Sequence, residues 1–100
     1  MLETRAYCVN VLTQGQQDLS NRFAKKGQDK FDGVAWSAGT TGAPVIDDTL
    51  VSIECAVSDV IEAGDHHIFC GTVQRLVANE SVDEQPLLYY GGRYAAVKAV

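Results

Sequence analysis

Basic residues are few in this 100-residue sequence, and long hydrophobic runs are missing from it. Eight Lys and Arg residues stand against 13 Asp and Glu residues. The resulting net charge of −5 argues against nucleic-acid binding, which relies on basic side chains against phosphate. No apolar run approaches the roughly 20 residues of a membrane-spanning helix. Residues 1–5 show no basic head before an apolar stretch, so we expect neither a signal peptide nor a membrane partner.

Cysteine is also scarce, and its three positions form no Cys-x-x-Cys pair: Cys8, Cys55 and Cys70. An odd count without a secretory signal predicts reduced, buried thiols in a cytoplasmic protein. The adjacent residues His66 and His67 lack the spacing of zinc ligands, so we expect no metal site. With 46% hydrophobic and 21% charged residues, the chain has the composition of one globular domain at most.

The first strand is predicted at residues 5–12, which are rich in β-forming side chains that alternate. In that alternation Asn10 shares a face with Cys8 and Leu12. A polar amide on such a face needs hydrogen-bond partners. Neighbouring backbone groups or a ligand would satisfy it, and the sequence leaves both open.

A short helix, either continuous or interrupted, is predicted at residues 14–26. Thr13 and Gln16 have the spacing of a capping box, and Leu19 and Phe23 form an apolar stripe. At the C-terminal end of this helix, Lys25 and Lys26 interact favourably with the helix dipole. Gly27 suits the left-handed cap position that follows. The basic residues of this region predict either a solvated helix face or a local anion site.

Glycine and proline punctuate residues 27–48, which we expect to form a long loop that Trp36 anchors to the core. Residues 49–61 and 66–78 then alternate over enough length to predict an antiparallel hairpin. In residues 49–61 one face is apolar and the other carries Ser52 and Glu54, the pattern of a strand with one buried and one solvent-facing side. Gly71, in the middle of its second strand, marks a bulge or a close approach of another group.

A polar, acidic connection is predicted at residues 79–86, and a last strand at 87–90 and 93–99. Five strands and one helix define a mainly β protein. Its antiparallel sheet is expected to curl toward a barrel.

Six segments resemble, in their order and spacing, the short-chain flavin reductase family, which includes the reductase components of two-component flavin monooxygenases. Together they cover essentially the whole chain. The matching segments are residues 7–12, 19–24, 29–34, 42–46, 64–66 and 86–94.

The resemblance implies an antiparallel split β-barrel that is mainly β, carries one short helix and is incomplete. Residues 1–100 correspond to the C-terminal part of a single domain of this family. Nothing in the chain resembles the family's N-terminal strands or its Ser/Thr-rich turn, which holds the isoalloxazine and phosphate of the flavin. We therefore expect the N-terminal part of the domain to be missing from this sequence.

The function that the resemblance implies is an NAD(P)H-dependent flavin reductase. Hydride passes from NADH or NADPH to FMN or FAD, and the reduced flavin then reaches a partner monooxygenase. The resemblance also implies a homodimer. Alternatives are a non-catalytic flavin-binding split-barrel module, an inactive fragment of such a domain, or a structural β-domain that is similar in fold alone.

The family pattern places Ser20, Arg22 and Phe23 at the phosphate and ribityl end of the flavin. A planar guanidinium binds phosphate bidentately, which agrees with that role for Arg22. The alternatives are a surface ion pair for Arg22 and a place in the helix core for Phe23. Asn10 is a further candidate contact to the flavin, and no residue is assigned as catalytic because the cofactor carries the chemistry.

The nicotinamide side of the site is expected at two other segments. His66 matches a family position associated with nicotinamide binding, and its alternative is a solvated turn histidine. Tyr89, Tyr90, Gly91 and Gly92 match the second segment, where aromatic faces stack on flat rings and glycines allow close approach. An ordinary β-turn is the alternative there. Relatives often carry an arginine where this chain has Gly91, and the glycine cannot supply the charge contact to the dinucleotide that such an arginine offers.

Overall fold

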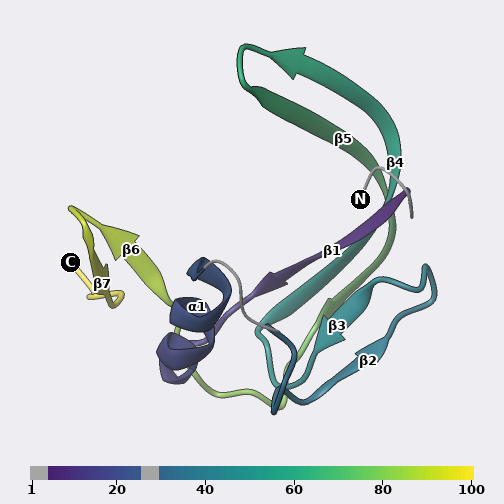
Figure 1. The fold of residues 1–100 in the computed structure, drawn as a ribbon. Coiled ribbons are helices and arrows are strands. Elements are labelled where there is room, and N and C mark those ends of the chain that lie inside the picture. The colour runs from purple at the N-terminus through teal and green to yellow at the C-terminus, as the bar shows by residue number, and fades with distance from the viewer. Residues whose placement is uncertain (1–4, 26–29) are drawn as a thin grey trace.

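A three-stranded antiparallel sheet organises the protein, whose computed structural model describes residues 5–25 and 30–100 (Figure 1). Its strands are β1 (Ala6–Val11), β4 (Val51–Ala63) and β5 (His66–Ala78), in the order β1-β4-β5. Two small hairpins accompany it: β2 (Trp36–Ala38) with β3 (Pro44–Ile46), and β6 (Leu88–Tyr90) with β7 (Arg93–Ala95).

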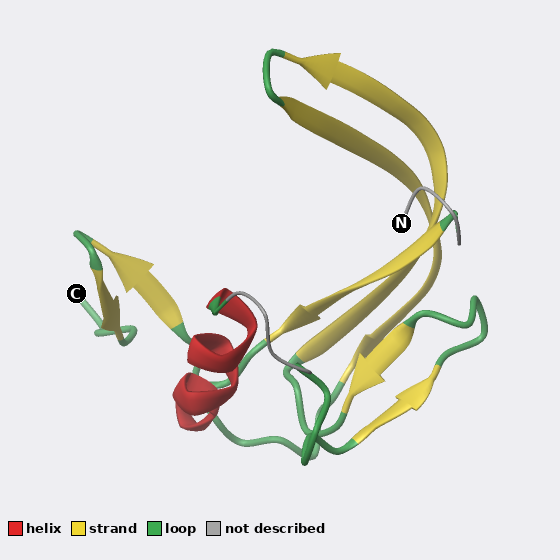
Figure 2. Ribbon diagram, viewed as in Figure 1, coloured by secondary structure: helices red, strands yellow, loops and turns green. Residues whose placement is uncertain are grey.

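The predicted fold class is confirmed: the described residues are mainly β, with antiparallel sheets and one short helix (Figure 2). These strands form open sheets rather than a closed barrel. None of the helices in the described ranges is long and apolar enough to cross a membrane.

The helix is shorter than predicted and begins with a tighter turn. A 3₁₀ turn, η1 (Gln14–Gln16), leads into α1 (Gln17–Ala24). The Gln16 side chain closes the predicted capping box, because its Oε1 accepts the Thr13 backbone N–H at 2.9 Å. At the other end the Lys25 N–H donates to the Arg22 carbonyl at 3.3 Å. The predicted cap residues Lys26 and Gly27 lie outside the described ranges.

The expected loop at residues 27–48 is wrong in part, because it contains the β2–β3 hairpin. Two of the glycines that suggested a loop, Gly39 and Gly42, lie in the turn of this hairpin, where the Gly39 N–H donates to the Ala43 carbonyl at 2.9 Å. Trp36 does not anchor a loop from a buried position. It lies in β2, is 44% exposed, and packs its ring 5.2 Å from that of Phe31.

The long hairpin of β4 and β5 is confirmed, and one of its two irregularities falls where the glycine predicted it; the other lies between Glu54 and Cys55. The register shifts between Val57 and Asp59, opposite Gly71. A Cβ atom on Gly71 would lie 2.4 Å from the Tyr7 hydroxyl and 2.9 Å from Cβ of Cys55. Tyr7 of β1 therefore crosses the sheet surface through the space that glycine leaves.

The prediction of a polar, solvent-facing side for β4 is wrong at Ser52 and Glu54, which are 7% and 2% exposed. The turn of the β2–β3 hairpin covers this part of the strand and supplies hydrogen bonds to the Glu54 carboxylate. Its Oε1 accepts the Thr41 N–H at 3.1 Å, the Thr41 hydroxyl at 3.1 Å and the Thr40 hydroxyl at 3.4 Å. Glu54 thus joins the hairpin to the sheet.

The core is small, and much of β5 is uncovered. Its buried hydrophobic residues are Ala43, Ile46, Cys55 and Val57. Contrary to the prediction of buried thiols, only Cys55 is buried, whereas Cys8 and Cys70 are intermediate. β7 ends at Ala95 rather than at residue 99. On β5 four large hydrophobic side chains are exposed: Ile68, Val73, Leu76 and Val77.

Candidate functional site

The polar connection after β5 returns the chain to the helix. The Gln14 N–H donates to the Gln85 carbonyl at 2.8 Å, and the Leu87 N–H donates to the Leu12 carbonyl at 3.0 Å. These bonds fix the start of β6 beside the start of the helical segment, so the β6–β7 hairpin rises next to α1 (Figure 1). The helix that carries Ser20, expected at the flavin, and the hairpin that carries Tyr89, expected at the nicotinamide, are therefore neighbours.

A polar hollow of about 680 Å³ lies between α1 and the β6–β7 hairpin. We call it the tyrosine hollow, and its lining residues are Gln17, Ser20, Asn21, Ala24, Tyr89, Gly92, Arg93 and Tyr94. Amide, hydroxyl and guanidinium groups converge here with two aromatic rings. Because Arg93 is the one charged residue of this lining, the hollow suits a polar or anionic ligand.

On the other side of the helix lies an apolar chamber of about 300 Å³, which we call the aromatic pocket. Its walls are Cys8, Asn10, Leu12, Leu19, Ser20, Phe23, Phe31, Pro44 and Ile46. The rings of Phe23 and Phe31 meet edge to face with centroids 5.1 Å apart. Burial raises the pKa of the Cys8 thiol, so this side chain stays protonated and contributes to an apolar wall.

Asn10 lies in the wall of the aromatic pocket, and neighbouring backbone groups use its amide. Oδ1 accepts the Ile46 N–H at 3.0 Å, and Nδ2 donates to the Pro44 carbonyl at 3.3 Å. Asn10 therefore holds β3 against β1. The sequence left two kinds of partner open for the Asn10 amide, and the structure shows hydrogen bonds to neighbouring backbone groups. A contact of Asn10 to a flavin stays a prediction.

Ser20 is the residue that the two cavities share, because it lines both the aromatic pocket and the tyrosine hollow. The helix period explains this position: Ser20 lies on the turn between Phe23, which faces the pocket, and Gln17, which faces the hollow. The junction places an apolar, aromatic chamber directly beside a polar one.

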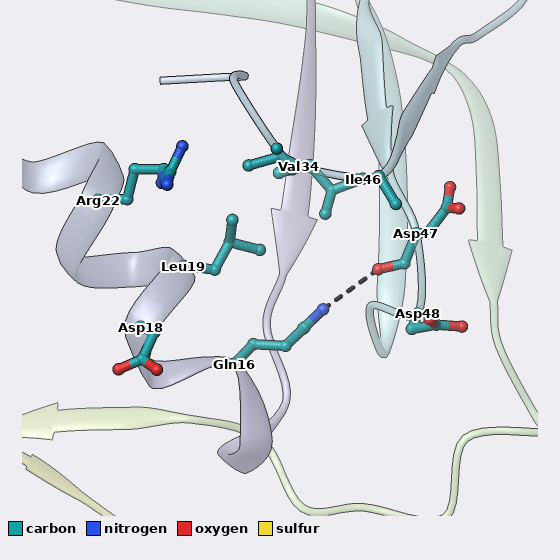
Figure 3. A pocket seen from close by; sticks show the side chains of 10 residues that line it. Gln16, Asp18, Leu19, Arg22, Val34, Ile46, Asp47 and Asp48 are labelled. Atoms are coloured by element: carbon teal, nitrogen blue, oxygen red, sulfur yellow. Dashed lines mark hydrogen bonds between the residues drawn. The ribbon is translucent and has the colours of Figure 1, made fainter. Parts of the chain in front are cut away.

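Arg22 faces a third cavity of about 330 Å³, shown in Figure 3. Leu19, Val34 and Ile46 approach one another in its middle. Three acidic residues also belong to its lining, Asp18, Asp47 and Asp48. The Arg22 guanidinium donates to the backbone carbonyl of Asp32. The structure thus separates Arg22 from the two cavities that contain Ser20, and its phosphate contact remains a prediction.

Within this chain, His66 lies apart from the other predicted site residues. It lies at the tip of the β4–β5 hairpin with its side chain 83% exposed, 3.4 Å from the Asp65 carboxylate. In Figure 1 this tip and the β6–β7 hairpin are at separate ends of the molecule. Tyr90 is 82% exposed, and the turn after it contains Gly91 and Gly92, both at positive φ.

Asn21, Arg93 and Tyr94 were missed by the sequence reasoning, although all three line the tyrosine hollow. Asn21 and Tyr94 each belong to a segment that carried the resemblance, but nothing in local spacing pairs positions 73 residues apart. The signal that was present is the basic Arg93 directly after the glycine turn, in an otherwise uncharged strand.

The fold is that of a mainly β protein that holds an apolar cavity beside a polar one. The sequence matches the family described as flavin reductase like domain over residues 1–98. The chain therefore belongs to this flavin reductase family.

Relatives and solved structures agree with that assignment. The chain is 43% identical over 96 residues to the FMN reductase (NADH) RutF of Pseudomonas syringae, covering 93% of this chain and 52% of the relative. It is 41% identical over 92 residues to the flavin-dependent monooxygenase reductase subunit HsaB of Mycobacterium tuberculosis, covering 92% and 49%. The crystal structure of nitrilotriacetate monooxygenase component B from Mycobacterium thermoresistibile matches with a TM-score of 0.85 and 40% identity, covering 91% of this chain and 51% of that one.

The chain spans about half the length of the curated relatives it matches.

Proposed function

We propose that this chain belongs to an NAD(P)H-dependent flavin reductase that supplies reduced FMN or FAD to a partner monooxygenase. The observation that carries the proposal is the position of Ser20, which lines both the aromatic pocket and the tyrosine hollow. A flavin nucleotide has a flat, largely apolar ring system attached to a polar chain that ends in phosphate. The paired cavities match this distribution, because ligand sites combine apolar walls with a few placed polar groups.

A bound flavin supplies the redox chemistry by accepting hydride from the nicotinamide. The chain's own residues bind the flavin and shield it from water. Phe23 and Phe31 line the apolar chamber and exclude water from it, while Ser20 provides a hydroxyl at its mouth. Arg93 offers a guanidinium to a phosphate, and the Tyr89 ring offers a face for stacking.

The names of two relatives favour the choice of substrates and partner. One relative is named an FMN reductase (NADH), and another is named the reductase subunit of a flavin-dependent monooxygenase. We therefore propose NADH as the hydride donor and a monooxygenase as the acceptor of the reduced flavin. His66, Tyr90 and Gly91 are proposed contacts to the nicotinamide nucleotide, and Arg22 is a proposed contact to the flavin phosphate.

Turnover and flavin affinity test this proposal together. Purified protein is mixed with NADH and with FMN or FAD, and the loss of NADH absorbance is followed. We expect NADH loss that depends on added flavin. Phe23→Leu keeps the apolar volume but removes the flat ring, so the Kd for flavin, measured by quenching of flavin fluorescence, should rise about tenfold.

Phe69→Leu is the matched control, because Phe69 lies on β5 outside all the lining residues of the two cavities. Its flavin Kd should equal that of the unmutated protein. Flavin binding without NADH loss would instead support a non-catalytic flavin-binding module. Equal Kd values for the two Phe variants would contradict the placement of the flavin in the aromatic pocket.

We further propose that the protein is a homodimer. The exposed Val73 and Leu76 of β5 support this, since both are more than half accessible on a strand with a free edge in the described part of the chain. Light scattering coupled to size exclusion should give twice the protomer mass for the whole protein. A monomer mass that does not change with protein concentration would contradict the proposal.

A further inference from the structure

Tyr94 makes both hydrogen bonds that join the β6–β7 hairpin to α1 within the described residues. Its hydroxyl oxygen lies 2.9 Å from Oγ of Ser20 and 3.0 Å from Oδ1 of Asn21. All three residues line the tyrosine hollow. The contact therefore sits inside the proposed site and fixes its two walls relative to each other.

The protons of this cluster can be assigned from the chemistry of the groups. A phenol carries one proton, and an amide oxygen can only accept. Both bonds are satisfied when Tyr94 donates to Oδ1 of Asn21 and accepts the hydroxyl proton of Ser20. Ser20 lines the hollow, and with its proton engaged by Tyr94 only its lone pairs remain for a further hydrogen bond. It is therefore prepared to accept a hydrogen bond rather than to donate one to a phosphate.

The ring of Tyr94 also supports Tyr89. Their centroids are 5.2 Å apart and their planes meet at 79°, an edge-to-face contact. Tyr89 is 68% exposed and lies on a three-residue strand, so this contact sets the direction of its ring within the hollow. One side chain thus controls the hydrogen-bonding state of Ser20 and the orientation of Tyr89.

We propose that Tyr94 is a positioning residue for a bound nucleotide, and that it holds Ser20 as the acceptor for a sugar hydroxyl of that nucleotide. The inference rests on the proposed function and deepens it. A sugar hydroxyl is offered both by the ribose of the nicotinamide nucleotide and by the ribityl chain of the flavin. Both sources have the required chemistry, a hydroxyl group that donates to a serine oxygen, and the measurement separates them.

Tyr94→Phe tests the proposal, because it keeps the ring against Tyr89 and removes only the hydroxyl. In the whole protein, Kd values for FMN, FAD and NADH are measured by fluorescence, together with KM and kcat. We expect one affinity to fall about tenfold, as for the loss of one hydrogen bond. A change in the NADH constants alone assigns the ribose, and a change in the flavin Kd assigns the ribityl chain. Ser20→Ala should give the same loss, and the double variant should add little to it.

Ser81→Ala is the control, because Ser81 also donates to an asparagine oxygen, that of Asn79 at 2.7 Å, but in an exposed connection. Its affinities should be unchanged. A Tyr94→Phe protein with unchanged Kd and KM values, whether or not its kcat or Tm falls, would overturn the positioning role. Absence of NADH turnover in the unmutated protein contradicts the proposed function instead, and the Kd values still decide the role of Tyr94. If the unmutated protein binds neither flavin nor NADH, both are overturned.

Discussion

Gly71→Ala should lower the Tm of the protein by about 10 °C, because the added methyl group has no space. Its Cβ would lie 2.4 Å from the Tyr7 hydroxyl and 2.9 Å from Cβ of Cys55. Tyr7 can rotate only at the cost of its place across the sheet, and Cys55 is a buried residue of the adjacent strand. Overpacking of this kind costs about 1–3 kcal/mol, and each kcal/mol lowers the Tm of a domain this size by roughly 4–8 °C.

A double-mutant cycle with Tyr7→Phe identifies the cause. Removal of the Tyr7 hydroxyl opens part of the space, so the two substitutions together should cost less than the sum of their separate costs. Thr72→Ala, at the exposed neighbouring position of β5, should leave the Tm nearly unchanged. Thermal unfolding followed by circular dichroism provides the Tm of all five proteins. Strict additivity would show that Gly71 matters for a reason other than its contact with Tyr7.

Glu54→Gln should destabilise the protein at neutral pH, and the difference from the unmutated protein should shrink in acid. The Thr41 backbone N–H lowers the pKa of Glu54, while the Thr41 and Thr40 hydroxyls and the charge of Arg75 act in the same direction against an opposing effect of burial. A carboxyl whose pKa is lower in the folded state contributes stability above its unfolded pKa. That contribution is lost as the pH falls through the folded value.

The measurement is the Tm of both proteins at a series of pH values from about 7 down to about 3, which spans the ordinary carboxyl range. At pH 7 the glutamine variant should unfold on the order of 5 °C earlier. Glu80→Gln, on the exposed connection, is the matched control and should follow the unmutated protein throughout. A Tm difference for Glu54→Gln that is the same at every pH would show that shape, rather than charge, is responsible.

Sequence patterning predicted the long elements well, because their signals are repeated many times. The β4–β5 hairpin has 13 residues in each strand, and its alternation identifies it without any knowledge of the rest of the fold. The β2–β3 hairpin escaped prediction because each of its strands has three residues, too few to show a period against frequent glycines. Glu54 was placed on a solvent face because alternation identifies sides but cannot show that a distant turn will cover one of them.

The site was predictable only where the resemblance supplied it. Ser20 and Phe23 came from a matched segment of the helix, and the structure places Phe23 in the wall of the aromatic pocket and Ser20 in the walls of both cavities. Local spacing could not show that Tyr94 would reach Ser20, since the two positions are 74 residues apart. The hollow is a property of the connection that returns β6 to the helix, and that return depends on backbone hydrogen bonds that no side-chain pattern encodes.

That separation of 74 residues also bears on how the site forms in time. Local hairpins close quickly, whereas contacts between distant parts of a chain must first overcome the entropy of a large loop. We therefore expect the β4–β5 hairpin to form early and the β6–β7 hairpin to dock on α1 late. The tyrosine hollow is consequently among the last features to assemble and among the first to open during native-state fluctuations. A bound nucleotide would act on this late step by closing the hairpin onto the helix.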